Sequence, residues 1–217
     1  MVDDLTASDE VGSDGARSAF LDLPPAGYGQ RIGLFGGSFD PPHEGHRHVC
    51  RTALKRLELD AVWWMVTPGN PFKAWHRRPS AAERLAALAR FVRHPRFRVT
   101  GFEAEHGFGY TARTLAYLKA RRPDLRFVWL MGADNLATLH NWYRWRRVVG
   151  TVPIAVIDRP GSGYSMISSR FAISYADARI DASDAALLAD MDPPAWVFLY
   201  GPEMNISSTD LRLRACP

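Results

Sequence analysis

The segment at residues 32–48 constrains the fold of this chain more than any other. It reads Ile-Gly-Leu-Phe-Gly-Gly-Ser-Phe-Asp-Pro-Pro-His-Glu-Gly-His-Arg-His. Its apolar start predicts a short strand that ends at Gly36 and Gly37, and residues 38–42 predict a turn. Apolar residues then recur at helical spacing from Val49 to Leu57, which predicts a helix. A strand, a glycine-containing turn and a helix in this order are typical of an α/β unit whose helix N-terminus binds phosphate.

Two histidines fall at the start of that predicted helix. His43 and His46 would add side-chain donors to the free backbone amides there, and Gly45 between them has no Cβ, so a ligand can lie against the backbone. The alternative is a merely tight turn with solvated histidines. Spacing excludes a G-x-G-x-x-G dinucleotide fingerprint, a Walker-type loop and a zincin motif, whose second histidine would fall on Arg47. We therefore predict an anion site without metal ligands.

The rest of the chain alternates between apolar runs and helical patterns. Further strands are expected at residues 61–66, 97–102, 126–131, 152–157 and 196–200. Helices are expected after Ser80, after Tyr110, near residues 166–175 and from Ser207, whereas residues 103–109 look like a loop. Arg84, Arg90 and Arg93 are expected on the solvent-facing side of their helix. This order predicts a Rossmann-like α/β fold, a doubly wound parallel sheet in a single domain with ligands above the carboxyl ends of its strands.

Charge separates the first residues from the rest. Residues 1–29 lack periodicity and are rich in Asp, Ser, Gly, Ala and Pro, which predicts a flexible extension before a domain at residues 30–217. Residues 1–30 have a net charge of −5, so the total of +4 leaves +9 for residues 31–217. A basic body favours an anionic ligand, but the dispersed arginines and the lack of a recognition motif argue against nucleic acid. Two cysteines, no long apolar run and an acidic N-terminus predict a cytoplasmic protein without a membrane anchor.

Two motifs carry a resemblance to a known family. Residues 36–46 resemble the H-x-G-H signature of the nucleotidyltransferase superfamily, most closely that of bacterial nicotinate-nucleotide adenylyltransferases. Residues 206–212, Ile-Ser-Ser-Thr-Asp-Leu-Arg, resemble the second signature of that superfamily. The resemblance implies adenylyl transfer from ATP to nicotinate mononucleotide, giving deamido-NAD and pyrophosphate, with Mg²⁺ held mainly by the phosphates. Many members continue for about another helix after the arginine, whereas this sequence stops at Pro217, which puts in doubt any oligomer contact that such a tail would make. A homo-oligomer stays open.

The resemblance also assigns the site residues. Charge stabilisation during catalysis is assigned to His43, His46 and Arg212. Residues implied in ATP binding are Gly36, Gly37, Ser38, Phe39, Gly45, Gly132, Asp134, Arg159, Ser207, Ser208 and Thr209. Residues implied in binding the nicotinate nucleotide are Asp40, Lys73, Thr111, Trp142 and Tyr143. Among these, Trp142 is expected to stack on the pyridine ring and Thr111 to meet its carboxylate, and no residue is implied as a metal ligand.

Other functions stay open at this point. The acceptor could be nicotinamide mononucleotide or pantetheine phosphate, because the two core signatures do not separate these substrates. A non-catalytic nucleotide-binding module would keep the fold, although binding alone would not need the complete set of charge-stabilising residues. A nicotinamide-dependent oxidoreductase is disfavoured by the glycine spacing.

Overall fold

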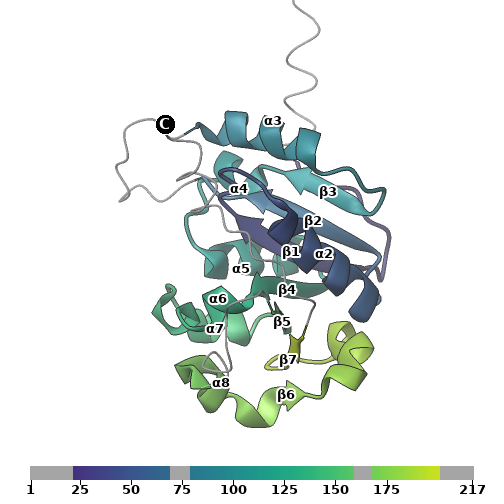
Figure 1. Cartoon of the computed structure of the whole chain (residues 1–217), viewed down its shortest axis with the longest axis vertical. Coiled ribbons are helices and arrows are strands. Elements are labelled where there is room, and N and C mark those ends of the chain that lie inside the picture. Colours follow the sequence, from purple (N-terminus) through teal and green to yellow (C-terminus); the bar gives the residue numbers. More distant parts are fainter. Residues whose placement is uncertain (1–21, 69–78, 159–167, 201–217) are drawn as a thin grey trace, which may run out of the picture.

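A computed structural model describes residues 22–68, 79–158 and 168–200. Within these ranges, seven parallel strands form one sheet in the order β3-β2-β1-β4-β5-β7-β6. The strands are β1 (Arg31–Gly37), β2 (Ala61–Val66), β3 (Phe97–Thr100), β4 (Arg126–Gly132), β5 (Ile154–Ile157), β6 (Arg179–Ile180) and β7 (Trp196–Leu199). Figure 1 shows this sheet twisting from β3 to β6 with helices around it. The predicted parallel α/β fold is confirmed.

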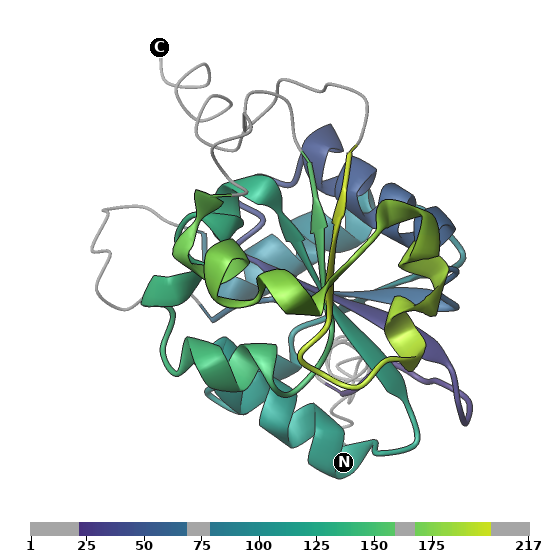
Figure 2. The ribbon, with the colours of Figure 1, turned by 90° about the horizontal axis from the view of Figure 1, so that it is seen from below.

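Helices cover both faces of the sheet, as Figure 2 shows with the strands fanned between them. One face packs against α2 (Glu44–Arg56), α3 (Ala81–Phe91) and the 3-10 helix η4 (Ala182–Asp190). The other face packs against α4 (Phe102–Glu105), α5 (Thr111–Arg121), α6 (Ala133–Leu136), η1 (Leu139–Asn141), α7 (Trp145–Val149) and α8 (Arg170–Ser174), and the 3-10 turn η3 (Ala176–Ala178) follows α8. The sheet is therefore doubly wound.

Successive side chains of the central strands enter opposite cores. Along β2, Trp63 and Met65 pack on the side of α5, whereas Val62, Trp64 and Val66 pack on the side of α2. All five are fully buried. A parallel strand covered by helices on both faces must be apolar at consecutive positions, which is why these strands appear in the sequence as continuous apolar runs.

The strand order reverses direction between β1 and β4. From β1 the chain moves outward to β2 and β3, then returns to the other side of β1 to form β4 and β5. The connections that leave the carboxyl ends of β1 and β4 therefore run to opposite faces. Such a reversal opens a crevice above the carboxyl ends of the two strands, where open α/β sheets bind ligands.

Several boundaries differ from those expected. β3 ends at Thr100, because the backbone N–H of Phe102 donates to Thr100 Oγ1 at 3.2 Å and turns the chain into α4. The predicted loop at 103–109 therefore begins as a helix. The helix expected near residues 166–175 is observed as α8, Arg170–Ser174, with Ser169 as its N-cap. The helix expected from Ser207 lies outside the described residues.

The last part of the predicted N-terminal extension is packed. Leu23 and Ala26 lie against the core, Thr100 Oγ1 donates to the carbonyl of Asp22 at 2.9 Å, and the N–H of Gly29 donates to the carbonyl of Asp124 at 3.0 Å. The expected flexible character is therefore wrong for residues 22–29, because they cover apolar surface; residues 1–21 lie outside the described ranges. Among the described residues, none of the helices combines the length and apolarity needed to span a membrane.

Candidate active site

The start of α2 brings the two predicted histidines together. His43 is the N-cap of α2 and is 4% exposed, and the centroids of the His43 and His46 rings are 3.7 Å apart. The backbone N–H of His43 donates to Nδ1 of His46 at 3.2 Å. Because Nδ1 accepts this bond, the ring proton of His46 is on Nε2, which becomes a hydrogen-bond donor. The two histidines are therefore not independent solvated side chains. They form an ordered pair at the N-terminus of α2, the positive end of the helix dipole.

Phe39 packs its ring against the ring of His46. It is 2% exposed, its ring centroid lies 5.1 Å from that of His46 and 5.4 Å from that of Trp64, and its φ angle is 47°. A phenylalanine in this left-handed region is strained and usually marks a functional turn. Since the side chain is part of the core, a contact of Phe39 with ATP would involve its backbone.

The two glycines before the turn are required by packing. As expected, they are the last two residues of β1. A Cβ at Gly36 would lie 2.8 Å from Cη2 of Trp129, and a Cβ at Gly37 would lie 3.0 Å from the Phe39 ring. Glycine thus lets two aromatic rings approach the end of β1 closely.

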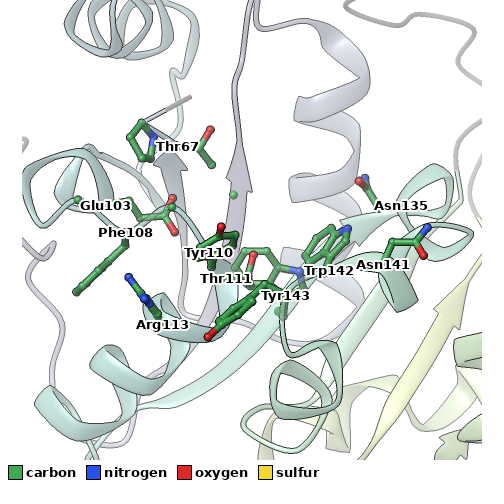
Figure 3. A pocket seen from close by; sticks show the side chains of 15 residues that line it. Thr67, Glu103, Phe108, Tyr110, Thr111, Arg113, Asn135, Asn141, Trp142 and Tyr143 are labelled. Atoms are coloured by element: carbon green, nitrogen blue, oxygen red, sulfur yellow. The ribbon is translucent and has the colours of Figure 1, made fainter. Parts of the chain in front are cut away.

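A cavity of about 570 Å³ lies above the carboxyl ends of β1, β2 and β4. Four of the predicted residues line it: Gly36, Thr111, Trp142 and Tyr143. The lining residues also include seven that were not predicted as site residues: Thr67, Glu103, Phe108, Arg113, Trp129, Asn135 and Asn141. Figure 3 shows their side chains, which come from segments on both sides of the sheet reversal. This volume is in the range of small-molecule sites.

Aromatic rings form one wall of the cavity. Trp142 meets Trp129 edge to face, with ring centroids 6.3 Å apart, and Tyr143 lies against Tyr110 with centroids 4.5 Å apart. Trp142 and Tyr143 lie between η1 and α7, so they are not packed inside a helix. Thr111 is the first residue of α5, with Tyr110 as N-cap, and the first amides of a helix have no acceptor within it. The wall can therefore stack on a flat ring whose polar substituent meets α5.

Other predicted residues lie at the same edge of the sheet but do not line this cavity. Ser38 and Asp40 are in the turn after β1, and Gly45 is buried in the first turn of α2. Gly132 ends β4, and the exposed Asp134 follows it on α6, where its neighbour Asn135 lines the cavity instead. Six predicted residues lie outside the described ranges: Lys73, Arg159, Ser207, Ser208, Thr209 and Arg212.

The expected solvent-facing position of Arg84 is wrong. Arg84 is 6% exposed, and its guanidinium donates to the carbonyl of Ser38 at 2.9 Å and to that of Thr67 at 2.8 Å. Ser38 follows β1 and Thr67 follows β2, so Arg84 ties together two loops at the edge of the site. Helical spacing alone did not reveal this role, whereas Arg90 and Arg93 are exposed as expected.

Glu103 is a buried carboxyl group that was not among the residues predicted from the sequence. It is the second residue of α4, is 4% exposed and lines the cavity. Burial raises the pKa of this carboxyl to about 7, although a hydrogen bond from Thr114 acts in the opposite direction. The signal that could have found it is an acid directly after a strand end, the same signal that pointed to Asp134.

The raised pKa of Glu103 predicts a pH-dependent stability. A group whose folded-state pKa lies above its ordinary value of 4.5 stabilises the fold below pH 4.5, and this contribution is lost as pH rises through about 7. The loss corresponds to about 3 kcal/mol. We expect Glu103→Gln to remove that part of the pH dependence in urea unfolding between about pH 4.5 and pH 8. Glu105→Gln, exposed on the same helix, is the control, and equal pH dependence in both variants would contradict the prediction.

Comparison with known proteins adds family relationships to this geometry. Residues 34–214 match the cytidylyltransferase-like family. A probable nicotinate-nucleotide adenylyltransferase of Agrobacterium fabrum is 54% identical over 83% of this chain and 97% of its own length, and one of Mesorhizobium japonicum is 53% identical over 89% and 99%. The fold resembles Plasmodium falciparum nicotinic acid mononucleotide adenylyltransferase complexed with NaAD, with a TM-score of 0.64 and 16% identity over 85% of this chain and 83% of that chain.

Proposed function

Because this chain belongs to the cytidylyltransferase-like family and, within it, to the nicotinate-nucleotide adenylyltransferases, we propose that it transfers the adenylyl group of ATP to nicotinate mononucleotide. A phosphate oxygen of the mononucleotide attacks the α-phosphorus of ATP. The bond from that phosphorus to the bridging oxygen of the β-phosphate breaks, pyrophosphate leaves, and deamido-NAD forms. This is a step of NAD biosynthesis.

The observation that carries the proposal is the meeting of two subsites at the end of β1. Gly36, near the end of β1, lines the aromatic cavity, and the loop after β1 leads through Ser38 to the His43–His46 pair at the start of α2. A flat ring in the cavity and phosphates at the helix end would thus be held side by side. Such placement of two reactants supplies a large part of the rate enhancement in phosphoryl and nucleotidyl transfer.

The proposed nucleophile needs no general base. The second pKa of a phosphate monoester is about 6, so the nucleophile is largely dianionic at neutral pH. The chain's task is then to hold two anions together and stabilise the charge that develops on the leaving pyrophosphate. Nε2 of His46 is a donor suited to this role because Nδ1 already accepts from the backbone. His43 and, from the part outside the described ranges, Arg212 are proposed to share it.

Magnesium is proposed to enter with ATP, held by phosphate and water oxygens. The ion would be part of the nucleotide substrate. Within the described residues, no group of three His, Cys, Asp or Glu side chains gathers into a metal-binding cluster. We also propose the cytoplasm as the compartment, because ATP is the donor and the two cysteines of the chain are too few for the disulfide framework of a small secreted domain.

The test is pyrophosphate release with ATP and Mg²⁺ in parallel reactions with nicotinate mononucleotide, nicotinamide mononucleotide and phosphopantetheine. We expect the nicotinate substrate to be used most efficiently. The first backbone amides of α5, which begins at Thr111, lie beside the aromatic wall, and amides at the start of a helix favour an anionic substituent. A higher kcat/KM for another acceptor would contradict the assignment of the cavity. Release with none of them would leave a nucleotide-binding module, and ATP without acceptor is the control.

A further inference from the structure

Glu103 is the buried group in the cavity that the proposed mechanism does not use. Its Oε1 accepts a hydrogen bond from Thr114 Oγ1 at 2.5 Å, whereas Oε2 has no hydrogen-bond partner within the described part of the chain. The residue is 4% exposed and lines the cavity. A buried carboxyl oxygen without a partner is costly, and a hydrogen bond to a ligand atom would offset that cost.

The position of Glu103 ties it to the pyridine subsite. Thr114, which binds Oε1, lies one turn after Thr111 on the same side of α5. The carboxyl group therefore lies beside the first turn of α5, where the proposed substrate's ring substituent is expected. Figure 3 shows the Glu103 carboxyl turned toward Tyr110 and Thr111.

Among the described residues, few charged groups surround Glu103. The helix that carries it, α4, packs against β2, whose residues on this face of the sheet are the apolar Trp63 and Met65. The charged or titratable side chains that line the cavity with it are Arg113 on α5, whose guanidinium lies 5.8 Å from the Tyr110 ring centroid, and the two tyrosines, Tyr110 and Tyr143. On α4 and just after it, Glu105 and His106 are exposed. Burial is accordingly the largest influence on the Glu103 pKa, which it raises to about 7.

We propose that Glu103 determines the choice between acid and amide on the pyridine ring, by donating a proton from Oε2 to the carboxylate of nicotinate mononucleotide. This inference rests on the proposed function. When neutral, Glu103 gives that carboxylate a charge-assisted hydrogen bond in a dry site. When ionised, it repels the carboxylate at short range. A carboxamide substituent can form a hydrogen bond with Glu103 in either protonation state. Its N–H donates to the ionised carboxylate, and its carbonyl accepts from the neutral carboxyl group.

The inference predicts that binding of nicotinate mononucleotide takes up one proton at high pH. In the wild-type protein, KM for this substrate is expected to rise about tenfold for each pH unit above about 7. KM for nicotinamide mononucleotide is expected to stay nearly constant, so the preference for acid over amide decreases as pH rises. Titration of the phosphate nucleophile is common to both substrates and cancels in the comparison.

The experiment compares these KM profiles for the wild-type protein, Glu103→Gln and Glu105→Gln. In Glu103→Gln, the amide oxygen can still accept from Thr114, so its NH₂ group takes the place of Oε2 as a permanent neutral donor. We expect its KM for nicotinate mononucleotide to be independent of pH, whereas Glu105→Gln behaves like the wild type. A rise of equal slope in Glu103→Gln and the wild type, or a flat profile in the wild type, would overturn the inference.

A second measurement does not depend on the folding of a variant. Calorimetric titration of the wild-type protein with nicotinate mononucleotide at about pH 8, in two buffers of different ionisation enthalpy, counts protons taken up on binding. Uptake close to one proton supports the inference, and no uptake overturns it. If the wild-type protein turns over nicotinamide mononucleotide but not nicotinate mononucleotide at any pH, the proposed function itself fails, which is a different result from turnover without pH dependence.

Discussion

Replacing His46 by alanine is expected to lower the turnover number about a hundred- to a thousand-fold, which is the usual effect of removing one preorganised donor at a developing charge. The imidazole is held between the His43 amide, which binds Nδ1, and the ring of Phe39. Its Nε2–H is therefore directed without any rearrangement during the reaction. Steady-state pyrophosphate release with ATP and nicotinate mononucleotide measures the effect.

Two variants separate catalysis from folding at His46. In His46→Gln, the side chain at the third helical position can still accept from the His43 amide, as in a capping box; we expect it to unfold like the wild type yet remain slow. His94→Ala removes a histidine just before the amino end of β3, whereas the site lies at the carboxyl ends of the strands. This change should leave turnover unchanged. A His46→Ala enzyme whose turnover stays within about threefold of the wild type would remove His46 from the mechanism.

Replacing Arg84 by methionine is expected to lower the free energy of unfolding by about 3 kcal/mol. The change keeps most of the apolar stem but leaves the carbonyls of Ser38 and Thr67 without the guanidinium that now binds both. The loops after β1 and β2 would lose their common anchor. We also expect kcat/KM to fall at least about tenfold, because small displacements of positioning groups cost rate. Urea unfolding and steady-state kinetics measure the two effects.

Arg90→Met is the matched control, because Arg90 is exposed on the same helix. A surface change of this kind should alter the free energy of unfolding by no more than about 0.5 kcal/mol. Equal stability of the Arg84 and Arg90 variants would mean that the two hydrogen bonds contribute nothing net. Lower stability with unchanged kcat/KM would mean that Arg84 supports the fold without positioning the site.

Local patterns in the sequence were enough to predict the parallel α/β fold and the start of α2. The apolar run at residues 61–66 coincides with β2, and α3 begins after Ser80 as expected, with a capping box formed by Ser80 and Glu83. Such features depend on residues a few positions apart, so each segment carries its own signal. The same holds for His43 and His46, which belong to a single helical turn.

Only the tertiary structure decided the burial and the hydrogen-bond partners of Glu103 and Arg84. Glu103 is isolated from water because α4, α5 and the sheet close around it, and its hydrogen-bond partner lies 11 positions away. Arg84 reaches carbonyls 46 and 17 positions away, although its charge gave no reason to expect burial. The pKa of a carboxyl and the orientation of a guanidinium depend on the dielectric and the acceptors that folding brings to them. Periodicity along the chain describes neither, since both arise only when distant segments pack together.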